Sequence, residues 1–245
     1  WKVNSSKEPI DMTMKLIIPG VYQIGLRIVN AFLVDHGELT LIDTGTSSST
    51  EKILQSLNEI GRQPQDTQHI LVTHLHGDHT GSLAALKDLS GAQAYMHPLD
   101  ADLVRKGLTM RPVKPAPGLV NNLLYRFMSL QGSGGMSIQP AEIEIELKNG
   151  DELDFAGGLR VIHAPGHCAG QVVFLLPDNG GLLFAADAAS NMFGLGYPPI
   201  FEDLNEGNMT LSRLAALDFK IACFGHGSAI IGQAAERFRG KWSVI

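Results

Sequence analysis

The stretch Thr73-His74-Leu75-His76-Gly77-Asp78-His79-Thr80-Gly81 carries three histidines and one aspartate on a single short segment. An apolar run over residues 70–72 precedes it and is typical of a buried strand, and the apolar spacing over residues 82–89 is typical of a helix. We therefore expect the stretch to lie on a strand-to-helix turn. Imidazole and carboxylate groups are ligands of zinc and similar divalent ions, so the stretch predicts a metal site.

The order of side chains within this stretch predicts two neighbouring ions. On an extended turn His74 and His76 point to the same side and can hold one ion. Asp78 and His79 follow the small Gly77 and turn toward a second ion. A catalytic ion also needs a position left open for water. The alternative is that these are polar residues of an ordinary loop, but such a density of metal-binding side chains argues against it.

The pattern H-x-H-x-D-H on a strand-to-helix turn resembles the signature of the metallo-β-lactamase superfamily. The resemblance extends along nearly the whole chain, because four further segments match the family's metal-site segments in the same order. They contain Asp43, His167, Asp187 and His226. The resemblance implies an α/β (α+β) fold, a four-layer αββα sandwich of two mixed β-sheets with helices on the outer faces.

The resemblance also implies a binuclear metal site and a hydrolytic mechanism. Two divalent ions are expected, zinc first and manganese, iron or cobalt as alternatives. Their ligands would be His74, His76 and His167 for the first ion, Asp78, His79 and His226 for the second, and Asp187 bridging both. A hydroxide bridging the ions would attack the substrate, and the catalytic residue Asp78 would pass a proton to the leaving group. Asp43 would fix the orientation and tautomer of a ligand histidine.

The patterning of the chain agrees with such a fold. Apolar segments predict an antiparallel meander over residues 15–18, 21–24, 28–34 and 39–42. Strands then alternate with helices, which indicates helices packed on a sheet. With 44% apolar and 18% charged residues a substantial core is available, and we expect one domain over residues 1–245.

Residues 107–140 depart from this rhythm, because prolines and glycines surround an apolar, helical stretch over residues 119–130. We interpret them as a helical insertion near the site. Its apolar side chains, Phe127 among them, could cover an apolar substrate, or the insertion could simply pack on its own domain. Tyr197 and His163 are further candidates for the substrate pocket.

Charge and composition argue against nucleic acid and membrane as partners and leave a small-molecule substrate as the expected one. A net charge of −6 gives no footprint for nucleic acid or an anionic membrane, and no apolar run reaches the length of a membrane span. Two cysteines, Cys168 and Cys223, are too few for a disulfide framework. We interpret both as packing residues and expect a cytoplasmic protein. The chain begins with Trp1 rather than Met, which leaves a removed secretion signal open, and no oligomeric state is predicted.

The bridging Asp187 favours the binuclear hydrolases of the family over true class B β-lactamases, which lack that aspartate. We expect a small acyl substrate, first a lactone of the acyl-homoserine type and next a thioester, as in glyoxalase II, or another ester. Cleavage of β-lactams would be a side activity. Lactonases of this fold often carry a tyrosine where this chain has Ser190, so Tyr197 would have to replace it. A phosphodiesterase acting on nucleic acid and a non-catalytic metal sensor are the alternatives.

Overall fold

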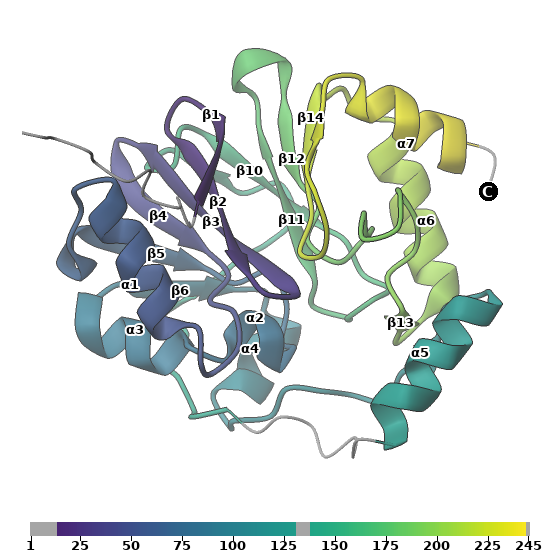
Figure 1. The fold of residues 1–245 in the computed structure, drawn as a ribbon, viewed down its shortest axis with the longest axis horizontal. Helices are drawn as coiled ribbons and strands as arrows, with labels where there is room; N and C mark the ends of the chain where they lie inside the picture. The colour runs from purple at the N-terminus through teal and green to yellow at the C-terminus, as the bar shows by residue number, and fades with distance from the viewer. Residues whose placement is uncertain (1–13, 131–137, 244–245) are drawn as a thin grey trace, which may run out of the picture.

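Two β-sheets face each other across the centre of the molecule, and helices cover the outer face of each sheet (Figure 1). The computed structural model describes residues 14–130 and 138–243. The predicted αββα sandwich is confirmed. Over the two described ranges, no helix combines the length and the apolar character that crossing a membrane requires.

The first sheet contains the predicted meander. In spatial order its described strands are β1 (Met14–Ile18), β2 (Val21–Leu26), β3 (Val29–His36), β4 (Glu38–Ile42), β5 (Thr67–Leu71), β6 (Gln93–Met96) and β8 (Ile145–Glu146). The first four strands pair antiparallel, and the pairs from β4 to β8 are parallel. The parallel strands require crossover connections, which the helices between them supply.

The second sheet is built from the later part of the chain. Its described strands, in spatial order, are β15 (Ile230–Ile231), β14 (Ile221–Cys223), β12 (Leu182–Phe184), β11 (Val172–Leu176), β10 (Leu159–His163) and β9 (Glu152–Leu153). Only the pair of β12 with β14 is parallel among these strands. A separate short ladder joins β7 (Lys114–Pro115) to β13 (Ile200–Phe201).

The helices form the outer layers. Against the first sheet lie α1 (Thr50–Glu59), α3 (Leu83–Ser90) and α4 (Pro98–Val104), with the short α2 (Gly77–Thr80) near its edge; α6 (Leu204–Ala215) and α7 (Ala234–Trp242) cover the second sheet (Figure 1). Single 3₁₀ turns lie at η1 (Pro64–Asp66) and η2 (Asp178–Gly180). Asp203 caps the start of α6, because its carboxylate accepts hydrogen bonds from the backbone amides of Asn205 and Glu206 in the first turn.

The core has three layers because the central strands are buried on both faces. Alternate residues of a strand point to opposite sides. In β3, Ala31 and Leu33 pack toward the helices of the first sheet, whereas Phe32 and Val34 pack between the two sheets. Phe32 meets Phe184 of the second sheet edge to face, with ring centroids 5.2 Å apart.

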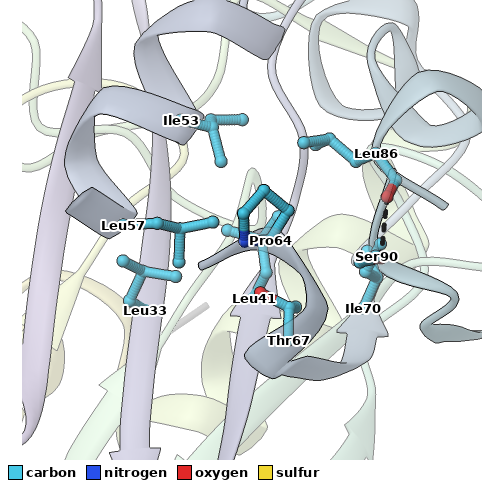
Figure 2. A pocket seen from close by; sticks show the side chains of 9 residues that line it. All are labelled: Leu33, Leu41, Ile53, Leu57, Pro64, Thr67, Ile70, Leu86 and Ser90. Atoms are coloured by element: carbon cyan, nitrogen blue, oxygen red, sulfur yellow. Dashed lines mark hydrogen bonds between the residues drawn. The ribbon is translucent and has the colours of Figure 1, made fainter. Parts of the chain in front are cut away.

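A cavity of about 10 Å³ lies in the layer between the first sheet and α1 and α3. Figure 2 shows that apolar side chains such as Leu33, Ile53, Leu57 and Leu86 surround it. A space of this size holds at most about one water molecule, and its lining offers little to bind one. It is a packing gap and not a substrate site.

Residues 107–140 contain the predicted helix, α5 (Leu119–Leu130), and the short strand β7, which was not predicted. Leu119, Val120 and Leu123, near the start of this helix, are 90%, 63% and 71% exposed, so they do not pack on the rest of the chain as described. Position 127 lies in the part of α5 whose side chains are outside the description. The assignment of this segment as an insertion in a single domain stays a prediction.

Candidate metal centre

The predicted ligands all lie at or beyond strand ends, where loops held by rigid sheets can converge. His74 and His76 follow β5, Asp78 and His79 lie in α2, His167 follows β10, Asp187 follows β12 and His226 follows β14. The two sheets meet so that these loops face one another. All seven side chains come together in one cluster.

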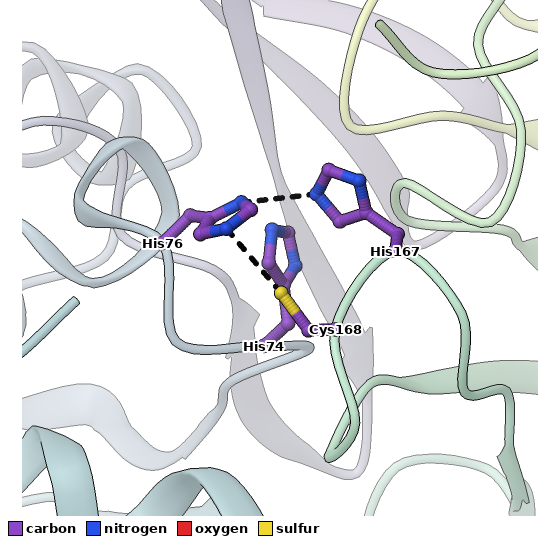
Figure 3. Close-up of side chains that lie close together, drawn as sticks. All are labelled: His74, His76, His167 and Cys168. Carbon is purple, nitrogen blue, oxygen red and sulfur yellow. Dashed lines mark hydrogen bonds between the residues drawn. The ribbon is translucent and has the colours of Figure 1, made fainter. Parts of the chain in front are cut away.

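Three histidines form one side of the cluster. Nδ1 of His76 lies 2.9 Å from Nε2 of His167, and His74 lies between these rings, with centroids 4.8 and 4.9 Å away (Figure 3). All three side chains are buried. Such a trio can bind one cation from three sides.

Asp187 connects this trio to the rest of the cluster. One carboxylate oxygen, Oδ2, lies 3.5 Å from Nε2 of His167 and 3.2 Å from Nε2 of His226. The other oxygen, Oδ1, lies 3.7 Å from Nε2 of His79. Asp78 completes the second group, because its Oδ2 lies 3.4 Å from Nε2 of His226. The carboxylate of Asp187 thus faces both groups of ligands.

The backbone is unusual where these groups meet. Asp43 and Ala186, the residue before Asp187, adopt positive φ angles of 60° and 46°, which residues with a side chain rarely do. Gly225 leaves no space for a side chain, because a Cβ atom there would lie 2.1 Å from Oδ1 of Asp187. Strain and close approach of this kind concentrate at functional sites.

Hydrogen bonds outside the cluster set the tautomers of four of its five histidines. Each donates its Nδ1–H to an oxygen: His74 to the hydroxyl of Thr73 at 2.9 Å, His79 to Asp43 at 2.8 Å, His167 to the carbonyl of Ile200 at 2.9 Å and His226 to the carbonyl of Ile28 at 2.6 Å. The Thr73 hydroxyl can accept because it donates its own proton to Asp43. When neutral, each of these rings therefore presents the lone pair of Nε2 to the cluster.

In His76 the two ring nitrogens have exchanged roles, because Nδ1 faces the cluster and Nε2 faces a side chain outside it. This partner of His76 was not predicted from the sequence. Nδ1 of His76 faces His167, and Nε2 lies 3.4 Å from Sγ of Cys168 (Figure 3). Cys168 is fully buried, and burial raises the pKa of its thiol well above 9.0. The neutral sulfur can accept the Nε2–H of His76, which leaves Nδ1 free. Its position directly after His167 was the available signal.

The electrostatics divide the histidines into two classes. Burial lowers the pKa values of His74 and His167, and that of His76 to about 3, so these rings are neutral. Burial also acts on His79 and His226, but nearby carboxylates outweigh it and raise their pKa values to about 9 and about 11. In return these histidines hold the pKa values of the two cluster carboxylates below 3.8, although burial opposes this.

Three buried polar atoms of the cluster lack a hydrogen-bond partner among the described residues. They are Nε2 of His74, Nε2 of His79 and Oδ1 of Asp187. These residues offer donor atoms within 4.8 Å of one another. An unsatisfied buried polar atom costs roughly 1–3 kcal/mol. A divalent cation would satisfy all three atoms, so the residues fit a metal.

The family follows from comparison with known proteins. A family profile described as the metallo-beta-lactamase superfamily matches residues 24–226. The chain belongs to the metallo-beta-lactamase superfamily. Membership identifies it as a metal-dependent hydrolase, and the His/Asp cluster lies inside the matched range.

The chain is also similar to curated proteins, two of which are named by an activity. The chain is 30% identical to the uncharacterized protein YobT of Bacillus subtilis, with 86% of this chain and 88% of that protein covered. It is 32% identical to a hydroxyacylglutathione hydrolase of Rhizobium meliloti and 28% identical to the thioesterase pkgB of Emericella nidulans. These alignments cover 69% and 87% of this chain but 52% and 49% of the relatives, so the chain spans about half the length of each.

Solved structures of the superfamily share the fold. A metallo-beta-lactamase of Cronobacter sakazakii superposes with a TM-score of 0.69 at 23% identity, covering 88% of this chain and 81% of that one. A metallo-beta-lactamase family protein of Thermus thermophilus superposes with a TM-score of 0.66 at 27% identity, covering 91% and 79%.

Two of the three residues predicted to line a substrate pocket, Tyr197 and His163, lie outside the cluster. The hydroxyl of Tyr197 donates to Asn208 at 2.9 Å. His163 stacks on His97 and lines a separate groove of about 500 Å³ beside α6. The side chain of Phe127 lies outside the description. These three assignments stay predictions.

Proposed function

We propose that this chain hydrolyses a small acyl substrate with the help of two divalent ions. His74, His76 and His167 would hold one ion; Asp78, His79 and His226 would hold the other; Asp187 would contact both. The observation that carries the proposal is the trio of buried, unpartnered atoms, Nε2 of His74, Nε2 of His79 and Oδ1 of Asp187, which point into one cluster. Zinc suits this mixture of imidazole and carboxylate, as do manganese, iron and cobalt.

The residues of the cluster would have different roles in the reaction. Two bound ions would lower the pKa of a water molecule from 15.7 to roughly 7 and polarise the substrate carbonyl. Asp78 is the better group to move a proton to the leaving group, because its side chain is 22% exposed whereas that of Asp187 is 5% exposed. Asp43 holds Nδ1–H of His79, which keeps Nε2 directed into the cluster.

The rim of the cluster supports a substrate with an apolar group. The carbonyl of Ile28 accepts a hydrogen bond from His226, and the side chain of Ile28 is 64% exposed. Asn191 donates its backbone N–H to the carbonyl of His226, and Phe193, two residues further along the chain, is 82% exposed. Exposed apolar side chains at and close to residues that bond the ligand His226 favour an acyl chain over a phosphodiester backbone.

Two observations favour a thioester over the lactone that the sequence placed first. Curated relatives include a hydroxyacylglutathione hydrolase and a thioesterase. The hydroxyl of Tyr197, the residue that would replace a lactonase tyrosine, is engaged by Asn208 of α6. We therefore propose thioesters as the first substrate class and lactones as the second.

A substrate panel on protein of known metal content tests this function. The panel contains a glutathione thioester, an acyl-homoserine lactone, a β-lactam and a bis-aryl phosphodiester. We expect about two ions per chain, thioester hydrolysis above the other activities, and loss of both metal and activity in His76→Ala. The matched control is His36→Ala, because His36 bonds the carbonyl of Pro19 and is outside the cluster. Phosphodiester cleavage with thioesters and lactones untouched, or full activity in metal-free protein, would overturn the proposal.

A further inference from the structure

Asp100 is a buried carboxylate that the reaction itself does not use. It lies in α4 and its side chain is fully buried. Oδ2 accepts the backbone N–H of Leu75 at 3.1 Å, and Oδ1 accepts the backbone N–H of Gly170 at 3.1 Å. Leu75 separates the two ligands His74 and His76. One side chain therefore bonds the backbone of two different ligand loops.

These two loops come from different halves of the fold. The loop containing Leu75 follows β5 of the first sheet, and the loop containing Gly170 joins β10 to β11 of the second sheet and carries His167. Contact between them is tight, because a Cβ atom on Gly170 would lie 2.5 Å from Cγ of Asp100. The Asp100 carboxylate thus lies between the loop that carries His76 and the loop that carries His167.

Arg111 and Glu202 extend this connection. Nη1 of Arg111 lies 2.7 Å from Asp100 and 3.1 Å from Glu202. Glu202 in turn accepts the backbone N–H of Ala169 at 2.9 Å and donates its own backbone N–H to the carbonyl of His167 at 3.1 Å. Arg111 belongs to the segment 107–140, so the same network ties that segment to the histidine loop.

The chemistry of this network indicates a geometric role. A buried ion pair is weak support for stability, because desolvation opposes the attraction between the charges. Burial raises the pKa of Asp100 even though Arg111 and two backbone amides favour the carboxylate. The network instead fixes the relative positions of the loops. Each oxygen of Asp100 bonds a different loop, and Arg111 links the carboxylates of Asp100 and Glu202.

We propose that Asp100 and Arg111 are positioning residues that hold the loop of His74 and His76 against the loop of His167. The proposal rests on the proposed metal-dependent function. The claim is selective. The network contacts the loops that carry His74, His76 and His167, and no hydrogen bond among the described residues joins it to Asp78, His79 or His226. Disturbing this network should lower the affinity for one of the two ions and leave the affinity for the other unchanged.

The test measures the affinity of each binding step. Metal-free protein is titrated with Zn²⁺ against a chromophoric chelator, and with Co²⁺ to follow its visible spectrum. Two conservative variants are used, Asp100→Asn and Arg111→Lys; the lysine keeps the charge but cannot contact two carboxylates as a planar guanidinium does. The matched control is Asp102→Asn, on the same helix, whose side chain is 72% exposed and pairs with Arg105.

We expect one of the two binding steps to weaken by roughly 10–100-fold in both variants, with a changed Co²⁺ spectrum, while Asp102→Asn resembles the wild type. Melting of the metal-free variants shows whether they fold. Wild-type affinity at both steps in Arg111→Lys and Asp100→Asn would overturn the positioning role, as would equal weakening of both steps together with a lower melting temperature. A wild-type chain that binds no divalent metal would overturn the proposed function and the positioning role with it.

Discussion

Oδ2 of Asp187 lies 3.2 Å from Nε2 of His226, although the two residues follow different strands of the second sheet, β12 and β14. These strands pair in parallel, so their ends meet at the same edge. The contact brings the carboxylate between both groups of histidines. It is the relationship on which the proposed function depends most.

Replacing Asp187 by asparagine should remove the charge that both groups share. We expect Asp187→Asn to lose at least one of two ions and to lower hydrolytic activity by more than about 100-fold, since even partners outside the ligand set cost 10–100-fold. In the metal-free variant the pKa of His226 should fall below about 11, because Asp187 is the main carboxylate that raises it. Metal analysis and NMR titration check this. Asp178→Asn, on an exposed turn before β12, is the control; an unchanged metal content would contradict the prediction.

The stability of the metal-free protein should depend on pH through the same cluster. The folded pKa values of His79 and His226, about 9 and about 11, exceed the ordinary value of 6.5. Their contribution to stability is therefore complete below pH 6.5 and is lost progressively as the pH rises toward those values. The lowered pKa values of Asp78 and Asp187 contribute stability above pH 3.8, which is lost below it. Melting in the presence of a chelator should show a falling transition from pH 6.5 to 9. A melting temperature that does not change over this pH range, or a pH dependence that Asp187→Asn leaves unaltered, would contradict the prediction.

Asp43→Asn tests a residue that supports the cluster without entering it. Oδ2 of Asp43 accepts the Nδ1–H of His79, and the positive φ of 60° at this position is one that asparagine tolerates. We expect metal affinity to fall by roughly 10–100-fold with the fold retained. Chelator competition measures the affinity, and Asp88→Asn, on the exposed face of α3, serves as control. Equal affinities in the two variants would show that His79 does not need this acceptor.

The Cys168 thiol should matter through His76. Removing its sulfur in Cys168→Ala takes away the group 3.4 Å from Nε2 of His76, so we expect metal affinity to weaken by about 10-fold or more. Cys168→Ser restores an acceptor and should recover part of the loss. The other buried cysteine provides the comparison, because Cys223→Ala should change stability but not metal affinity. Identical affinities for the alanine and serine variants of Cys168 would contradict the role as acceptor.

Phe193 should select substrates by their acyl chain. This side chain is 82% exposed and lies two residues after Asn191, whose backbone N–H bonds the carbonyl of His226. Covering part of it by an apolar chain would contribute about 1–2 kcal/mol, or about tenfold in binding. Phe193→Ser should raise KM for long-chain thioesters and leave acetyl thioesters nearly unchanged. Ile231→Ser, at an exposed position on the edge strand β15, is the control. Equal effects on short and long chains would contradict a binding role.

Much of the fold was predictable because local patterns carry it. Apolar segments predicted β1 to β4, and helical spacing predicted α3 and α5 close to their observed bounds. The short strands β7, β9, β13 and β15 were not predicted, since two residues are too few to establish a period. Their existence depends on partners that are distant in the sequence.

The sequence alone determined which residue types are available for the metal site and the order in which they occur. The H-x-H-x-D-H stretch is recognisable from its spacing, and its partners from the resemblance to the superfamily. Tertiary structure alone decided how those side chains are supported. The acceptor for each histidine, the contact of Cys168 with His76 and the bonds of Asp100 to two ligand loops all join residues far apart in the chain or depend on ring orientation. Hydrogen bonds act over about 3 Å, and no pattern along a sequence specifies which distant groups the folded sheets bring within that distance.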